Sequence, residues 1–220
     1  MGTSNPRWSI LIATVGRRED RFTRLLELLL PQATDDIEII AYWNNFEKPL
    51  GEIRQSLVEE ATGDYINFID DDDKIPSYYC AEVLDALSYN PDYVGWQQQL
   101  YQEGMPQKPT FHSLEHSYWH EDEDGWYRNI SHLNPIKRDI AKKVTFLVQD
   151  GVPEDYDWAQ RVAPLVKTEK YIDKIMYEYY PSAEDSIWRG VNEHGSYRRP
   201  TVEDKHFKWH TESKVYYGDS

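Results

Sequence analysis

The sequence contains a single cysteine, Cys80, among its 220 residues. An internal disulfide and a cysteine-cluster zinc site each need more than one cysteine, so both are excluded. Long apolar runs are also missing, since none approaches the roughly 20 residues that span a bilayer. The first residues, MGTSNPRWS, lack the apolar core of a secretory signal peptide. We therefore expect a reduced, cytoplasmic protein with no membrane span.

Basic residues are scarce relative to acidic ones. The chain has 24 Lys and Arg against 39 Asp and Glu, which gives a formal net charge of −15. Proteins bind nucleic acids largely because Lys and Arg displace counterions from phosphates, so free polynucleotide is a disfavoured partner. Anionic membrane surfaces are disfavoured for the same reason. Short local basic strips, such as Arg17-Arg18 and Arg198-Arg199, are still present within this acidic chain.

Aromatic residues, by contrast, are plentiful. The sequence has 17 Tyr and 8 Trp. Such residues pack protein cores, and they also serve as flat stacking surfaces in sites for sugars and nucleotides. The count is compatible with either role.

The first hundred residues alternate between strand and helix patterns. Apolar runs typical of buried strands occupy residues 8–13, 37–43 and 65–69, and helical patterns follow at 22–29, 53–61 and 77–89. This alternation predicts a mostly parallel central sheet with helices on both faces. Ligands of such sheets bind beyond the carboxyl ends of the strands. Residues 14–17, 44–45 and 70–73 should therefore gather on one rim.

The second half is less regular. We expect strands at residues 93–101 and 171–180, helices at 139–146 and 155–166, and a long excursion over 102–124 that is rich in Pro, His and acidic residues. No internal repeat or linker marks a domain boundary. The sequence thus predicts one α/β domain over residues 1–220.

Four consecutive carboxylates, Asp70-Asp71-Asp72-Asp73, directly follow the third predicted strand. Adjacent buried carboxylates repel one another, and a divalent cation relieves that repulsion. Mg²⁺ and Mn²⁺ prefer such oxygen ligands. In extended chain, alternate side chains share a direction, so Asp70 and Asp72 can face a cleft while Asp71 and Asp73 support the turn. The alternative is a solvated acidic turn, but the position on the ligand rim favours a metal site.

A second acidic group, Glu154-Asp155, follows Pro153 and opens a predicted helix. Acidic residues in a first helical turn often serve as caps and offset the helix dipole. The functional interpretation is a general base, which takes a proton from an attacking hydroxyl. These residues alone leave both interpretations open.

Taken in order, these segments resemble a known family. A strand followed by Thr14-Val15-Gly16-Arg17, then residues 50–54 (LGEIR), then 61–73 (ATGDYINFIDDDD) is similar to the nucleotide-binding half of GT-A glycosyltransferases. The greatest similarity is to the family-2-like inverting group. Residues 134–138 (NPIKR) followed by Glu154-Asp155 resemble that family's later half, and the resemblance covers roughly residues 8–180.

The resemblance implies a GT-A, Rossmann-like fold and assigns roles to individual residues. Asp72 and Asp70 would hold Mn²⁺ or Mg²⁺, Asp155 would be the catalytic base, and Glu154 would support nearby groups. The residues that would line the nucleotide-sugar pocket are Thr14, Arg17, Asn44, Arg54, Asp70 and Asp71. Residues 1–100 would bind the donor, and residues 101–220 would bind the acceptor and carry the base.

The implied reaction is a metal-dependent transfer, with inversion, of a sugar from a nucleotide-sugar to an acceptor hydroxyl. A UDP-sugar is the expected donor, and a glycan or a hydroxymethylated base in viral DNA is a candidate acceptor. Trp43-Asn44-Asn45 stands where the family usually has an acidic residue near the nucleobase. An additional metal ligand could be His132, His194, His206 or His210. The alternatives are a sugar-phosphate nucleotidyltransferase, which usually carries a longer basic Gly-rich loop, and a non-catalytic, metal-dependent carbohydrate-binding protein.

Overall fold

Three parallel strands form the centre of the sheet. The computed structural model describes residues 6–15, 18–44, 48–147, 153–181 and 207–209. Within these, β1 (Trp8–Val15) lies between β2 (Ile37–Asn44) and β3 (Tyr65–Phe68), and β10 (Phe207–Trp209) pairs with β2 in parallel. Every residue of β1, β2 and β3 is buried. Their nearly continuous apolar runs follow from this burial, because helices cover both faces of the sheet.

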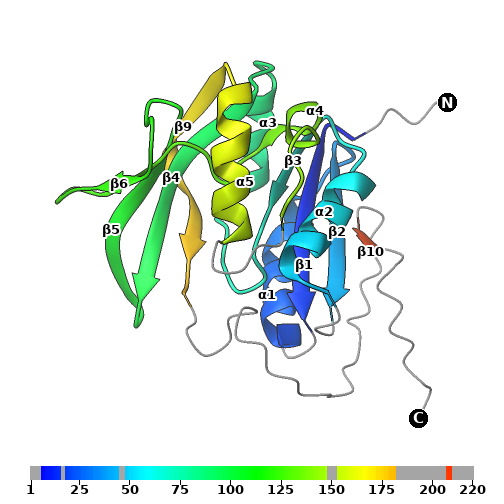
Figure 1. Cartoon of the computed structure of the whole chain (residues 1–220). Helices are drawn as coiled ribbons and strands as arrows, with labels where there is room; N and C mark the ends of the chain where they lie inside the picture. The colour runs from blue at the N-terminus through cyan, green and yellow to red at the C-terminus, as the bar shows by residue number, and fades with distance from the viewer. Residues whose placement is uncertain (1–5, 16–17, 45–47, 148–152, 182–206, 210–220) are drawn as a thin grey trace, which may run out of the picture.

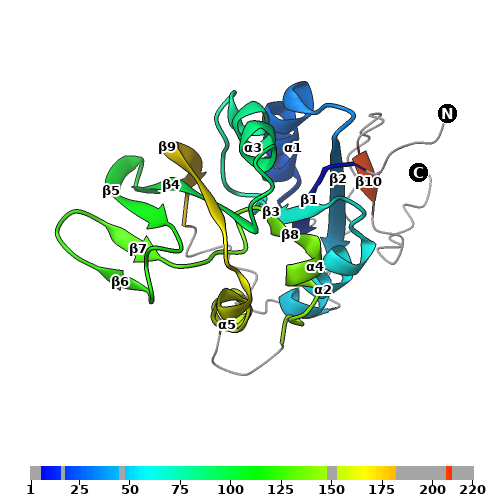
Figure 2. The same cartoon turned by 90° about the horizontal axis from the view of Figure 1, so that it is seen from above.

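The helices divide between the two faces, as Figure 2 shows. Helices α1 (Glu19–Leu29) and α3 (Tyr79–Leu87) pack in one apolar cluster, and α2 (Leu50–Glu60), α4 (Arg138–Ala141) and α5 (Glu154–Val162) in the other. Side chains of β1 alternate between the clusters, with Ile10 and Ile12 in the first and Leu11 and Ala13 in the second. This alternation is the period of two expected of a strand.

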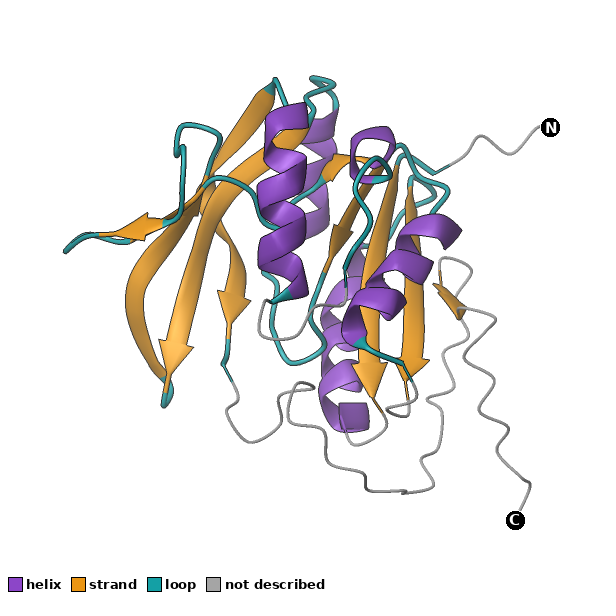
Figure 3. Cartoon of the chain, in the orientation of Figure 1, coloured by secondary structure: helices purple, strands orange, loops and turns teal. Residues whose placement is uncertain are grey.

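The second half of the chain extends the same sheet with both antiparallel and parallel pairings, so the whole sheet is mixed (Figure 3). Strand β8 (Ile136–Lys137) runs antiparallel to β3 and β4 (Tyr93–Gln102), and β4 pairs with β5 (Met105–His112) and β9 (Glu169–Tyr179). Outermost lie β7 (Trp126–Arg128) and β6 (His120–Glu121). The parallel order predicted for the first half is confirmed, and the second half adds the antiparallel part.

Two local predictions were wrong. The excursion over 102–124 contains β5 and β6, which the sequence hides because Pro106 and Pro109 interrupt any apolar alternation in β5. The helix predicted over 139–146 is only the single turn α4. The chain then leaves the helix, and the backbone N–H of Phe146 donates to the side chain of Gln55 in α2 at 3.1 Å.

The carboxyl ends of β1, β2 and β3 and the amino end of α5 lie at the same end of the molecule, the lower end in Figure 1. The described residues of the three predicted rim segments therefore lie at the same end of the molecule as Glu154 and Asp155. None of the described helices is both long and apolar enough to cross a membrane.

A buried histidine joins β5 to the segment before β8. His112 is 4% exposed, and its Nδ1 lies 2.6 Å from Oδ1 of Asn134. Burial lowers the pKa of His112 to about 4. The imidazole of His112 therefore takes up a proton at a lower pH in the folded protein than in the unfolded chain, where its pKa is about 6.5.

We expect the free energy of unfolding to fall by up to about 3 kcal/mol from this residue as the pH drops from 6.5 toward 4. Urea unfolding at several pH values in this window measures the effect. A His112→Gln variant keeps a polar side chain but does not titrate, so its stability should depend less on pH. Equal slopes for the two proteins would contradict this assignment.

Candidate functional site

The four aspartates form a turn directly after β3. The backbone N–H of Asp73 donates to the carbonyl oxygen of Asp70 at 3.2 Å, so the segment is a turn, not the extended chain assumed from sequence. Asp71 and Asp73 are 1% and 3% exposed. The side chains of Asp70 and Asp72 are 33% and 15% exposed. The predicted alternation in burial is thus present, although the backbone geometry that produces it differs.

Asp71 ties the turn to the end of β1. Its carboxylate accepts hydrogen bonds from Thr14 Oγ1 and from Arg18 Nη1, both at 2.7 Å. Burial raises the pKa of Asp71 to about 6, against the opposing effect of Arg18. Thr14 and Asp71 therefore hold the two loops together, and their predicted contact with a nucleotide-sugar stays a prediction.

The neighbouring aspartates have different surroundings. Asp72 Oδ2 lies 3.2 Å from Arg18 Nη1 and 3.5 Å from Arg21 Nη1. Asp73 Oδ1 accepts a hydrogen bond from the backbone N–H of Tyr180 at 2.8 Å. Burial raises the pKa of Asp73 well above its ordinary value, and the charges of Asp70 and Asp72 add to the effect.

Asp70 is paired with residues of α2 and of the segment before β8. Its Oδ1 lies 3.3 Å from Arg54 Nη2, and its Oδ2 lies 3.9 Å from His132 Nε2. Its backbone N–H donates to the hydroxyl of Tyr177 in β9 at 3.0 Å. Burial alone would raise the pKa of Asp70, but His132 and Arg54 outweigh it and lower the pKa below its ordinary value. Asp70 is therefore a carboxylate held in its charged form.

Arg54 is the buried link between this turn and α5. It is 4% exposed, and its Nε lies 3.4 Å from Oε1 of Glu154, which is also 4% exposed. Burial opposes the charge of Arg54, but Glu154 and Asp70 outweigh it, and the pKa of Arg54 is raised. Glu154 thus anchors α5 to the Asp70 side of the site through a single guanidinium.

Asp155, next to Glu154, points into the site instead. Its side chain is 32% exposed, and its Oδ2 lies 3.7 Å from Nδ1 of the buried His132. His132 therefore stands between Asp155 and Asp70, with one ring nitrogen toward each carboxylate. The other three histidines considered from sequence, His194, His206 and His210, lie outside the described residues.

Asn44 and Arg17 are also predicted to line the nucleotide-sugar pocket. Asn44 is at the end of β2 on the rim, but its side-chain amide donates to the carbonyl oxygen of Lys48 at 3.0 Å and so closes a turn. Arg17 lies outside the described residues. The assignment of both to the nucleotide-sugar pocket stays a prediction.

The chemistry of the donor set fits a hard divalent cation only in part. Asp70 and Asp72 offer carboxylate oxygens, the type of ligand that Mg²⁺ and Mn²⁺ prefer. Among the described residues, no three His, Cys, Asp or Glu side chains converge as a ready-made metal site. Mg²⁺ is commonly held by one or two carboxylates together with the phosphates of a substrate, so two aspartates suit that arrangement. Arg18 and Arg21 compete for Asp72.

A cavity of about 640 Å³ opens beside the turn, between α1 and the end of β9. Arg21, Arg24 and Lys74 contribute positive charge to its lining, and the aspartates from Asp71 to Asp73 form one wall. Such a mixture of cations and carboxylates suits an anionic group that arrives with a metal ion.

Sequence reasoning missed three contacts in this site. Arg18 was grouped with Arg17 only as a basic strip, although it is the residue that meets Asp71. Tyr177 was expected only as part of a strand. His132 was one of four equal candidates. Only His132 had a local signal, since it stands two residues before the Asn134-Pro135 segment that carried the resemblance.

Removing Arg54 should destabilise the fold strongly, because Glu154 would remain buried without its cation. We expect Arg54→Ala to cost about 3–5 kcal/mol in the free energy of unfolding. The double variant Arg54→Met/Glu154→Leu removes both buried charges and should recover part of that loss. Urea denaturation measures both variants, and a single variant as stable as the wild type would show that the ion pair is not needed.

Comparison with solved structures identifies the fold. No protein-family model and no curated protein matches the chain in sequence. Residues 1–349 of S. aureus TarS in complex with UDP-GlcNAc superpose with a TM-score of 0.65 at 15% identity, over 84% of this chain and 61% of TarS 1–349. For the complex of the same segment with UDP, the TM-score is 0.62 at 16% identity, over 80% and 61%.

The longer S. aureus TarS structure gives a TM-score of 0.61 at 16% identity, and this chain covers 37% of it. The chain thus spans about three fifths of TarS 1–349 and less of the longer protein. TarS is a GT-A-like glycosyltransferase. The predicted GT-A fold is confirmed: this chain is a single α/β domain of the GT-A glycosyltransferase fold.

Proposed function

We propose that this protein is a glycosyltransferase that moves a sugar from a nucleotide-sugar, a UDP-sugar, to an acceptor hydroxyl. The observation that carries the proposal is the convergence of Asp70 and Asp155 on His132, at the rim where this class of fold binds ligands. The fold likeness to TarS in complex with UDP-GlcNAc and with UDP supports the choice of donor.

The donor would bind on the side formed by the first hundred residues. Thr14 and Asn44 lie in the last two residues of β1 and β2, and Asp70 lies two residues after β3, so a nucleotide would lie across the carboxyl ends of these strands. His132 and Arg54 together lower the pKa of Asp70 and so favour its charged form. The segments after residue 100 supply Asp155 and the acceptor side.

Asp155 is the proposed general base. It is a part-exposed carboxylate at the first turn of α5, open to an incoming hydroxyl. It would take the proton of the acceptor hydroxyl as that oxygen attacks the anomeric carbon, and the nucleoside diphosphate would leave from the opposite face with inversion of configuration. His132 would act as a positioning residue, since its ring holds the orientation of the Asp155 carboxylate relative to Asp70.

Asp72 and Asp70 would hold Mn²⁺ or Mg²⁺, with the diphosphate of the donor completing the ligands. When bound, such an ion stabilises the negative charge that develops on the departing diphosphate. Arg18 and Arg21 lie against Asp72 and would neutralise part of the same charge.

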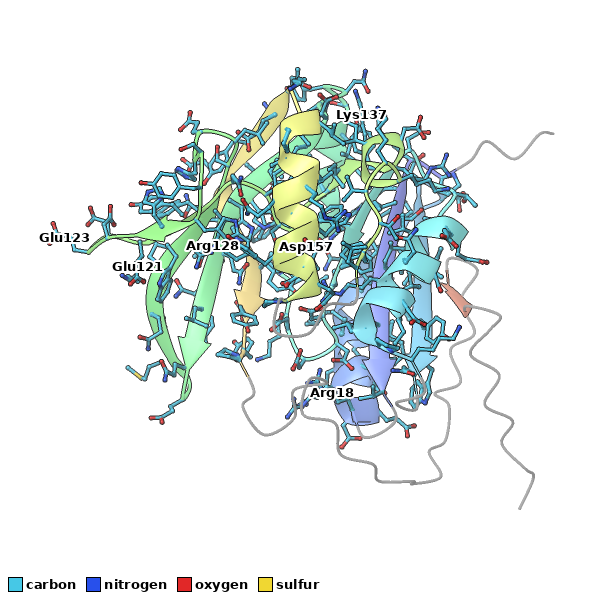
Figure 4. The ribbon with its side chains drawn as sticks, in the orientation of Figure 1. Arg18, Glu121, Glu123, Arg128, Lys137 and Asp157 are labelled. Atoms are coloured by element: carbon cyan, nitrogen blue, oxygen red, sulfur yellow. The ribbon has the colours of Figure 1, made fainter. Side chains whose placement is uncertain are left out.

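An Asp155→Asn variant should lose transfer but keep donor binding. The amide keeps the shape of the side chain and removes its basicity, so we expect the rate to fall about 10²–10⁴-fold. UDP release from UDP-GlcNAc in the presence of an acceptor panel measures the rate, and calorimetry measures donor affinity. Asp157→Asn on the same helix is the matched control, because Asp157 (labelled in Figure 4) pairs with Arg161 and should be dispensable for chemistry. Formation of a nucleoside triphosphate from pyrophosphate would instead indicate a nucleotidyltransferase.

An Asp72→Asn variant should weaken binding of UDP in the presence of Mn²⁺ by about tenfold or more, because one of two carboxylate ligands is lost. Without Mn²⁺, the wild type and the variant should bind UDP with similar affinity. Calorimetric titration with and without the metal separates the two cases. Asp85→Asn, on the exposed side of α3, is the control. An identical metal response in both aspartate variants would remove Asp72 from the proposed metal site.

A further inference from the structure

An aromatic surface lies directly beside the proposed base. Tyr156 follows Asp155 in α5, and its ring meets Trp119 at a centroid distance of 5.0 Å with the planes 79° apart. Trp119 belongs to the segment between β5 and β6, so the contact joins α5 to the outer part of the sheet. Tyr156 is 40% exposed. A large aromatic side chain therefore faces solvent one residue from the proposed base.

Trp119 is held in place by contacts of its own. Trp119 Nε1 donates to Oδ1 of Asn129 at 3.0 Å, and the guanidinium of Arg128 lies 4.7 Å from the Trp119 ring centroid. Trp119 also packs against the apolar cluster that contains α5. Trp119, which these contacts hold in place, therefore supports the Tyr156 ring. A single exposed aromatic residue elsewhere on a surface would have no such support.

The charge next to this surface is negative. The chain that leaves Trp119 continues through the exposed residues Glu121, Asp122, Glu123 and Asp124. Figure 4 shows Glu121 and Glu123 toward the outer end of β6, with Arg128 nearer to α5. Arg128 lies over the Trp119 ring, and Lys108 lies 3.7 Å from Glu121. The four carboxylates at residues 121–124 outnumber these two cations, so the net negative charge would repel an anionic acceptor.

We propose that this surface, formed by Trp119 and Tyr156, binds an uncharged saccharide as the acceptor. The inference rests on the proposed function and specifies its acceptor. A sugar ring carries a face of C–H groups that suits the negative face of an aromatic ring, and its hydroxyls suit neighbouring carboxylates. A saccharide on Tyr156 would lie one residue from Asp155. Duplex DNA with hydroxymethylated bases does not fit, since its phosphates would meet Glu121 to Asp124.

Two measurements test the proposal, and the first needs no donor. Saturation-transfer NMR with cellobiose, chitobiose and maltotriose should show binding to the wild type. Binding should be lost in Tyr156→Ala and retained in Tyr156→Phe, which keeps the ring. Tyr89→Ala is the matched control, because Tyr89 is 64% exposed and follows α3, away from this surface. Equal binding by Tyr156→Ala and the wild type would overturn the proposal.

The second measurement uses UDP-GlcNAc and compares neutral saccharides with a heparin disaccharide and a duplex containing 5-hydroxymethylcytosine. We expect Tyr156→Ala to raise the KM for the neutral acceptor at least tenfold and the control variant Tyr89→Ala to leave it unchanged. A wild-type preference for the anionic acceptors would overturn the inference while supporting the transferase. A wild type that binds neutral saccharides on Tyr156 but neither binds nor cleaves any nucleotide-sugar would refute the proposed function and leave the saccharide surface standing.

Discussion

The buried guanidinium of Arg54 is the interaction on which the site depends. It comes from α2 and lies against Asp70, after β3, and against Glu154, at the start of α5. These carboxylates are 84 positions apart in sequence (154 − 70). Desolvating three charges together is costly, and the cost is offset only while all three remain paired. The first half of the chain and α5 are thus held in one arrangement, because separation would leave a buried charge unpaired.

At the start of α5, the adjacent carboxylates Glu154 and Asp155 take different positions. Successive residues of a helix point about 100° apart, so one side chain of the pair can face the interior and the next can face the cleft. Glu154 is buried against Arg54, and Asp155 stays part-exposed beside His132. No side chain of the described residues caps the start of α5, so Glu154 fixes the helix through Arg54 and not as a cap. The part-exposed Asp155 is left to meet a substrate in the proposed reaction.

The sequence predicted most of what lies in the central strands, because β1, β2 and β3 are buried on both faces and read as apolar runs ended by Thr14, Asn44 and Asp70. It did not predict β5, whose prolines and exposed residues carry no periodic signal. The sequence also did not predict the contacts of Arg54 or the position of His132 between two carboxylates. Both depend on contacts between side chains far apart in the sequence, which local periodicity does not encode.

The positions of Asp70 and its partners constrain how the two substrates interact. Asp70 is shared by Arg54, which holds Glu154, and by His132, which faces Asp155. A donor that contacts Asp70 would therefore act on the same contacts that orient the proposed base. The proposed acceptor surface at Trp119 and Tyr156 reaches the same network by two routes, because Tyr156 follows Asp155 in α5 and Trp119 donates to Asn129, three residues before His132. Both substrates of the proposed reaction can therefore act on the setting of Asp155, the donor through Asp70 and the acceptor through α5 and the segment that carries His132.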